Sequence, residues 1–140
     1  AAVADYLRRG AALPLWLVGT SRGTTSAVAT ALQLPERVHG LVLTSSLDSG
    51  RGSLSDFALE RLRLPVLMIQ HRRDDCRASR AYNLGTIIDR LRSEQPRQLM
   101  LMDGGKNEGD PCQPWAWHGY NGIEGRVLKL AGAWMLSHAN

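Results

Sequence analysis

The sequence lacks any long hydrophobic run: nowhere in its 140 residues does a stretch approach the roughly 18 apolar residues that span a bilayer. It also lacks a charged start followed by an apolar segment and a small-residue cleavage site, so no signal peptide is visible. No initiator methionine precedes Ala1, which already belongs to the pattern of an amphipathic helix. We therefore expect no membrane partner, and we expect that residues upstream of Ala1 are missing.

Lysine is scarce, since only Lys106 and Lys129 occur among the 17 basic residues and the rest are arginines. The net charge of +4 raises the question of a nucleic-acid partner. The arginines occur in ones and twos, such as Arg8-Arg9 and Arg72-Arg73, and they alternate with acids. Because no basic stripe is interleaved with aromatic residues, we expect a solvated arginine-rich surface and no nucleic-acid partner.

The composition is that of a globular protein, with 44% hydrophobic and 21% charged residues. A length of 140 residues suits one domain, and neither an internal repeat nor a linker divides the chain. Short apolar runs predict strands at residues 13–19, 38–44, 65–70 and 98–102. Helical spacing predicts helices at residues 21–34, 53–62, 78–91 and 125–137, and Ser53 and Asp56 have the spacing of a capping box.

Strands that are apolar on both faces and alternate with helices indicate a parallel sheet covered on both sides. We therefore predict an α/β fold over residues 1–140: a three-layer sandwich around a short parallel sheet of about four strands. The longest stretch without a pattern is residues 103–117. A loop of that length in a compact domain is usually functional or held in place by other contacts.

The strongest local motif is Gly19-Thr20-Ser21-Arg22-Gly23, which follows a predicted strand and opens a predicted helix. This context is typical of a nucleophile elbow, in which a sharp turn exposes the serine hydroxyl. We expect a strained backbone at Ser21. We also expect that glycine is required at positions 19 and 23, because side chains there would collide with each other and with neighbouring strands. The N–H of Arg22 in the first helical turn is the expected oxyanion donor. The alternative is a glycine-rich turn with an incidental serine.

A nucleophilic serine needs a base, and the base needs an acid that orients it. His118 follows the fourth predicted strand, and Asp74 and Asp75 follow the third. The order serine, acid, histidine at successive carboxyl ends of parallel strands is the order of the elbow architecture. His71 is a weaker candidate base because it precedes the acid. One of the two aspartates could instead cap the helix that begins near residue 78.

Three segments carry a resemblance to the C-terminal half of bacterial α/β-hydrolases: WLVGTSRGTTSA, PVLMIQHRRDDC and WHGYNGIEGRV. They are most similar to a branch with an HxxDxC acid loop and a Cys…HGxxGIE histidine loop. The resemblance implies that Ser21 is the nucleophile, His118 the base and Asp74 the acid, with Asp75 left open. It implies a carboxylic ester hydrolase that acts on a small-molecule ester and needs no metal or organic cofactor.

The chain departs from this family because it supplies only about half of the strands of such a core. The missing half normally provides a second oxyanion donor, for which Gly104 or Gly105 is a possible substitute. The strand that starts at Leu13 would then have an open edge. We expect a second copy of the chain, as a homodimer, or an N-terminal partner to pair there. A fragment that is inactive without such a partner is the alternative function.

The two cysteines have no zinc-binding spacing, because CxxC pairs are absent. Cys76 follows the candidate acid and Cys112 precedes His118, so an assembled triad brings their loops together. We expect a disulfide, and with it a periplasmic or secreted protein, although two free cytosolic thiols are the alternative.

Aromatic residues gather around His118, and the segment between the second and third strands is too short for a lid. Trp115, Trp117 and Tyr120 are expected to wall an open substrate pocket. Packing of the two tryptophans onto the sheet is the alternative.

Overall fold

A four-stranded parallel sheet forms the middle layer of the computed structural model, which describes residues 2–8, 13–91 and 94–139. The strands lie in the order β1 (Trp16–Thr20), β2 (Gly40–Thr44), β3 (Val66–His71) and β4 (Arg97–Met102). All four predicted strands are confirmed, with small shifts at their ends. Every residue of β2 and β3 is buried, as expected for strands covered on both faces.

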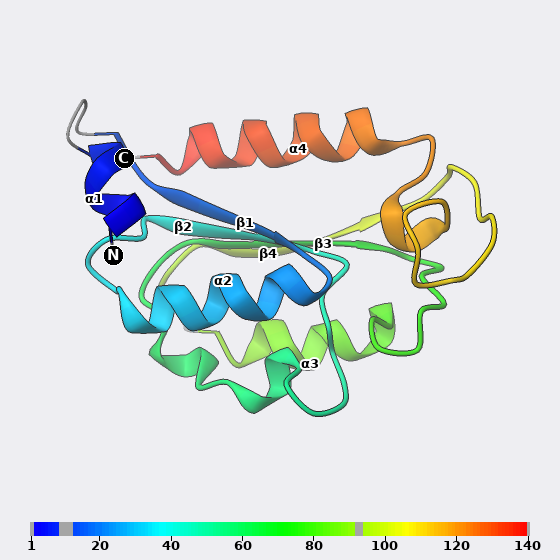
Figure 1. The fold of residues 1–140 in the computed structure, drawn as a ribbon, viewed down its shortest axis with the longest axis horizontal. Coiled ribbons are helices and arrows are strands. Elements are labelled where there is room, and N and C mark those ends of the chain that lie inside the picture. The colour runs from blue at the N-terminus through cyan, green and yellow to red at the C-terminus, as the bar shows by residue number, and fades with distance from the viewer. Residues whose placement is uncertain (1, 9–12, 92–93, 140) are drawn as a thin grey trace.

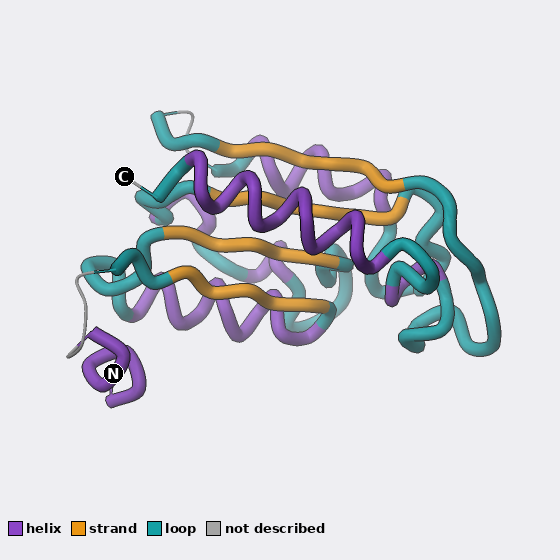
Figure 2. Tube along the Cα trace, turned by 90° about the horizontal axis from the view of Figure 1, so that it is seen from above, coloured by secondary structure: helices purple, strands orange, loops and turns teal. Residues whose placement is uncertain are grey.

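Helices cover both faces of the sheet (Figures 1 and 2). On one face lie α2 (Arg22–Gln33) and α3 (Leu84–Asp89), and on the other lies α4 (Glu124–Ser137). A short helix, α1 (Ala2–Arg8), precedes the sheet, and its Asp5 forms an ion pair with Arg37. The predicted three-layer α/β sandwich is therefore confirmed.

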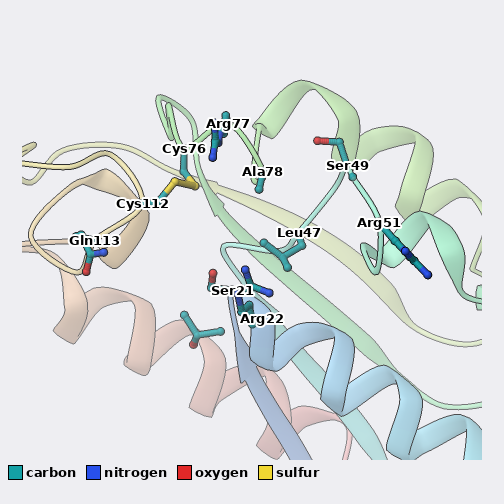
Figure 3. A pocket seen from close by; sticks show the side chains of 12 residues that line it. Ser21, Arg22, Leu47, Ser49, Arg51, Cys76, Arg77, Ala78, Cys112 and Gln113 are labelled. Carbon is teal, nitrogen blue, oxygen red and sulfur yellow. A yellow bond between two sulfur atoms is a disulfide. The ribbon is translucent and has the colours of Figure 1, made fainter.

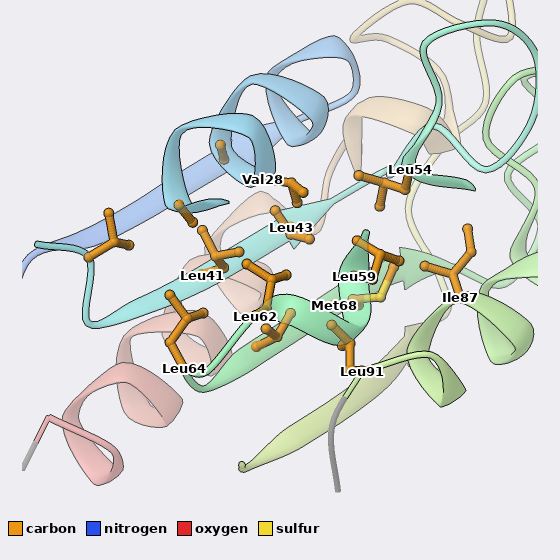
Figure 4. Packing of buried hydrophobic residues seen from close by; sticks show 14 of the residues in the cluster. Val28, Leu41, Leu43, Leu54, Leu59, Leu62, Leu64, Met68, Ile87 and Leu91 are labelled. Atoms are coloured by element: carbon orange, nitrogen blue, oxygen red, sulfur yellow. The ribbon is translucent and has the colours of Figure 1, made fainter. Parts of the chain in front are cut away.

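The side chains of β2 alternate between two apolar cores because successive residues of a strand point to opposite faces. Leu41 and Leu43 pack with Val28 of α2 and with the segment before β3 (Figure 4). Val42 points to the other side, where it packs beneath Val127 and Trp134 of α4. At the carboxyl ends of β2 and β3 the buried residues are polar: Thr44, Gln70 and His71.

The helix predicted at residues 53–62 is wrong: two 3-10 turns, Leu54–Asp56 and Leu59–Arg61, take its place. The capping box is wrong too, since the Asp56 carboxylate accepts a hydrogen bond from the Gly52 N–H, and Ser53 Oγ has no partner among the residues that the structure describes. Leu54, Leu59 and Leu62 are all buried in the same core. The broken path has a tertiary cause, because Arg90 donates hydrogen bonds to the carbonyls of Ser55 and Phe57, which a helix over 53–62 would use for its own bonds.

The helix predicted at residues 78–91 is also shorter than expected, because a 3-10 turn, Ala81–Asn83, precedes α3. Tertiary hydrogen bonds hold the backbone before it in an extended conformation. The Arg80 N–H donates to Asp48, and the Ser79 hydroxyl donates to Asp74. These bonds to carboxylates outside the predicted helix, Asp48 far along the chain and Asp74 just before it, outweigh the local helical preference.

The turn between β1 and α2 places Ser21 in a strained backbone conformation, with φ 52° and ψ −119°. Such a conformation costs a non-glycine residue on the order of 1–3 kcal/mol. A Cβ at Gly19 would overlap the Gly23 carbonyl oxygen and lie 2.9 Å from the Cα of Thr24. At Gly23 a Cβ would meet no described atom within 4 Å. The expectation that glycine is required is confirmed at Gly19 and wrong at Gly23, because α2 turns Gly23 toward open space.

Alanine at these two glycines is therefore expected to have opposite effects. Gly19→Ala forces the turn apart and should lower the free energy of unfolding by about 1–3 kcal/mol. Gly23→Ala should leave stability unchanged or raise it by up to about 1 kcal/mol, because alanine favours a helix. Urea denaturation of both variants measures the difference. Equal losses would mean that Gly23 is also required by a close contact.

Strand β1 lies at the edge of the sheet and pairs only with β2 among the described strands. Its register places Val18 beside Val42, on the face that α4 covers, yet Val18 is 62% exposed. Unpaired backbone groups beside apolar surface favour pairing with another chain. The pairing of a second copy or an N-terminal partner at this edge stays a prediction.

If two copies of the chain pair through β1, the mass measured by light scattering should rise with protein concentration toward that of a dimer. Val18→Lys should shift the dissociation constant upward by about tenfold or more, since a lysine on an edge strand opposes pairing. Leu128→Lys is a matched control, because Leu128 is as exposed as Val18 but lies on α4. A monomeric mass at all concentrations would exclude the homodimer.

Candidate active site

The carboxyl ends of three strands bring together Ser21, Asp74 and His118, which are far apart in the sequence. Ser21 follows β1, and Asp74 lies in the segment 72–80 after β3, here called the acid loop. His118 lies in the segment 103–123 after β4, here called the histidine loop. The His118 Nε2 atom is 3.0 Å from Ser21 Oγ, and its Nδ1 atom is 2.9 Å from Asp74 Oδ2.

The partners of His118 determine which ring nitrogen carries the proton. An ionised carboxylate can only accept hydrogen bonds, so Nδ1 donates its proton to Asp74. The Nε2 lone pair is then directed at Ser21 Oγ, whose hydroxyl donates to it. The imidazole is buried, and Ser21 is partly exposed. This arrangement can remove a proton from a hydroxyl that a small molecule can reach.

The Asp74 carboxylate is surrounded by hydrogen-bond donors. Its Oδ2 atom accepts from Gln70 Nε2 at 2.7 Å and from Ser79 Oγ at 3.1 Å, in addition to His118. Its Oδ1 atom accepts from the Cys76 N–H at 3.0 Å. Neighbouring Asp75 is exposed. The structure therefore brings Asp74, and not Asp75, to His118.

His71, the weaker candidate base, has a different set of contacts. The Arg73 N–H donates to its Nδ1 atom, so its Nε2 atom carries the proton and donates to the Gly104 carbonyl at 2.9 Å. The ring stacks on Trp117, and the Arg73 guanidinium lies 4.2 Å from the centre of the Trp117 ring. His71 thus joins the acid loop to the histidine loop next to His118.

Ser45 and Tyr120 hold the histidine loop against the sheet. Ser45 Oγ donates to the His118 carbonyl at 2.5 Å, and the Ser45 N–H donates to the Tyr120 hydroxyl at 3.0 Å. That hydroxyl in turn donates to the Ile69 carbonyl at 2.7 Å. Burial raises the pKa of Tyr120 well above its usual range, so the phenol keeps the proton that this bond needs.

Ser45, Gln70 and Ser79 hold His118 or Asp74 by hydrogen bonds, yet they belong to none of the motifs in the sequence. A signal existed for Gln70, because a long polar side chain inside a buried apolar strand must find hydrogen-bond partners. Ser45 directly follows the apolar strand β2, and its φ of 46° is unusual for a serine. Their partners lie on other strands and loops, so only the folded chain identifies their role.

The predicted disulfide between Cys76 and Cys112 is present and joins the acid loop to the histidine loop. It links residues separated by 36 positions, with their Cα atoms 4.7 Å apart. Cys76 also contacts the site directly, because its backbone N–H donates to Asp74. The disulfide therefore restrains the loop that carries Asp74 and the loop that carries His118.

A cavity of about 650 Å³ opens beside Ser21 (Figure 3). Its walls come from the start of α2, from the loop after β2, and from the disulfide with its neighbours Arg77 and Gln113. The turn that bears Ser21 and Arg22 lies across it from Cys76 and Arg77 (Figure 3).

The predicted aromatic wall is wrong for this cavity, since none of Trp115, Trp117 and Tyr120 lines it. Tyr120 is buried by its bonds to β2 and β3, Trp117 stacks on His71, and Trp115 is exposed on the outer surface. Of the two tryptophans, Trp117 packs onto the sheet, because its ring stacks on His71 at the end of β3. Gly104 and Gly105 do not line the cavity either, because both pack near the turn at residues 121–123.

Among the described residues, no group of three or more histidine, cysteine or acidic side chains is placed to hold a metal ion. None of the helices in that same part of the chain has the length and apolar content that a bilayer crossing requires.

No protein-family model matches the chain, and no curated protein matches its sequence. Solved structures do match its fold. A dienelactone hydrolase from Anabaena variabilis is 20% identical, with a TM-score of 0.71 over 98% of this chain. An esterase domain from Rhodothermus marinus is 18% identical, with a TM-score of 0.64 over 99% of this chain. A monoacylglycerol lipase from Paleococcus ferrophilus is 11% identical, with a TM-score of 0.60 over 98% of this chain.

The chain is shorter than these proteins. It spans 56% of the dienelactone hydrolase, 67% of the esterase domain and 74% of the lipase. At these identities the likeness concerns the fold, and the predicted resemblance is confirmed at that level. The sheet order, the helices on both faces and the matched structures together give this chain a four-stranded part of the α/β-hydrolase fold.

Proposed function

We propose that this chain is a serine hydrolase that cleaves carboxylic esters through an acyl-enzyme. The observation that supports this proposal most is the continuous line of hydrogen bonds from Ser21 through His118 to Asp74. The strained turn at Ser21 adds support, because strain at a hydroxyl beside a cavity is typical of functional sites. The hydrolase names of the matched structures agree with this reading.

In the proposed first half-reaction, His118 Nε2 takes the proton of Ser21 as Ser21 Oγ attacks the ester carbonyl carbon. The Asp74 carboxylate stabilises the imidazolium that forms. The tetrahedral intermediate collapses, the bond to the alcohol oxygen breaks, and His118 gives its proton to the leaving alcohol. Ser21 then carries the acyl group as an ester.

In the second half-reaction, His118 takes a proton from water, and the resulting hydroxide oxygen attacks the acyl carbon. Collapse of this intermediate breaks the bond to Ser21 Oγ, which recovers its proton from His118. The acid is released, and the enzyme returns to its starting state. These steps use only side chains of this chain and water.

The oxyanion of both intermediates needs donors, and Arg22 is the proposed source of one. Arg22 begins α2, and a backbone N–H in the first turn of a helix has no partner inside that helix. The partial positive charge at the start of a helix adds to the attraction. A single donor of this kind typically contributes about 10²–10³ in rate.

A fluorophosphonate probe tests the proposed nucleophile directly. It should label the chain covalently, and Ser21→Ala should abolish both the labelling and the hydrolysis of p-nitrophenyl acetate. Asp74→Asn should lower kcat by about 10⁴ because the imidazole loses its orienting acceptor. Asp75→Asn is the matched control and should keep wild-type activity. Labelling that persists in Ser21→Ala, or equal losses at the two aspartates, would contradict the proposal.

The disulfide should matter for stability and for the geometry of the site. Closing a loop of this length stabilises a chain by about 4 kcal/mol if the effect is mainly entropic. Cys112→Ser should lower the urea midpoint accordingly and reduce esterase activity at temperatures where the variant remains folded. Dithiothreitol should destabilise the wild type but not Cys112→Ser. An unchanged midpoint in the variant would show that the link does not restrain the loops.

A further inference from the structure

The cavity beside Ser21 is lined by positive charge without a matching negative charge. Three of its lining residues are arginines, Arg22, Arg51 and Arg77, and none of the described aspartates and glutamates lines it. They come from three separate parts of the chain: the start of α2, the loop after β2 and the acid loop. Their meeting at one cavity is therefore a product of the fold.

Three arginines elsewhere on the surface have carboxylate partners. Arg37 pairs with Asp5, Arg72 with Asp103 and Arg90 with Glu60. Within the described part of the chain, Arg22, Arg51 and Arg77 make neither an ion pair nor a side-chain hydrogen bond. Their guanidinium groups keep all their donors available to a ligand.

The nearest buried carboxylates are already occupied and do not neutralise the cavity. Asp74 accepts from four groups, including His118. Asp48, next to the lining residue Ser49, accepts from the Arg80 N–H and from Asn83 Nδ2. Asp75 and Asp110 line a neighbouring cavity together with Arg77, outside the cavity beside Ser21. Because three arginines and, within the described part of the chain, no carboxylate line the cavity beside Ser21, its charge favours an anion.

We propose that the ester taken by this site carries a carboxylate, bound by Arg77 together with Arg22. This inference rests on the proposed esterase function and names its substrate class. Arg22 adjoins Ser21, and Arg77 lies across the cavity beside the disulfide (Figure 3). Arg51 lies on the loop after β2, farther from Ser21, and adds to the positive electrostatic field of the cavity (Figure 3). A guanidinium presents paired donors that match the two oxygens of a carboxylate.

The position of Arg77 suits a specificity role. It follows Cys76 directly, and the disulfide anchors that residue to the histidine loop. Arg77 belongs to the acid loop, so its backbone is held by the same disulfide that joins this loop to the loop of His118. A substrate whose carboxylate meets Arg77 would have its ester group directed toward Ser21, across the cavity.

The test compares matched neutral and anionic esters at low ionic strength. In the first pair, mono-4-nitrophenyl glutarate carries a carboxylate on the acyl side, and 4-nitrophenyl valerate is its neutral counterpart. A second pair, 4-carboxyphenyl acetate against phenyl acetate, places it on the alcohol side. We expect kcat/KM to favour the anionic ester of at least one pair by about tenfold, because each exposed ion pair contributes about threefold. Added 0.5 M NaCl should reduce this preference.

Arg77→Gln should lower the ratio of kcat/KM for the anionic ester to that for its neutral counterpart by about three- to fivefold. Arg72→Gln removes the same charge from an arginine whose partner is Asp103, outside the cavity, and should leave the ratio unchanged. Equal ratios in Arg77→Gln, Arg72→Gln and the wild type would overturn this inference.

The two proposals fail in distinguishable ways. Hydrolysis of the neutral esters with no preference for either anionic ester would overturn the carboxylate assignment and leave the esterase proposal standing. No hydrolysis of any ester, together with no fluorophosphonate labelling, would overturn both.

Discussion

A carboxylate inside a protein costs several kcal/mol unless hydrogen-bond donors replace its water. Asp74 meets this constraint with donors from β3, from its own loop and from the histidine loop. Gln70, one of these donors, also accepts from the Ser46 N–H, which connects the end of β2. The segments that follow β2, β3 and β4 are therefore joined through one buried charge, and the position of His118 depends on it.

Two further devices keep this polar end of the sheet in one arrangement. The disulfide closes the acid loop onto the histidine loop, and the Tyr120 hydroxyl bridges the ends of β2 and β3. The two apolar cores on the faces of the sheet stabilise the fold, while the polar end of the sheet sets the geometry of the candidate site.

Prediction from the sequence succeeded where a short segment carries its own constraint. The apolar runs identified all four strands, and the glycine at position 19 marked a turn that admits no Cβ. It failed where a distant contact outweighs a local preference. Arg90 bonds the carbonyls of Ser55 and Phe57 in the segment where a helix was expected, and the backbone before α3 is held by Asp48 and Asp74. Local helical propensity is weaker than these combined contacts.

By itself, the sequence determined the type and order of the strands, the turn at Ser21, and the candidates Asp74 and His118, because these follow from local spacing and chain order. The tertiary structure brought Asp74, and not Asp75, to His118, and only the tertiary structure placed the aromatic residues away from the cavity. It also gathered beside Ser21 three arginines, Arg22, Arg51 and Arg77, that have no carboxylate partner among the described residues. Those outcomes depend on distances between segments that are remote in the chain, and such distances exist only after the strands have paired and both cores have packed.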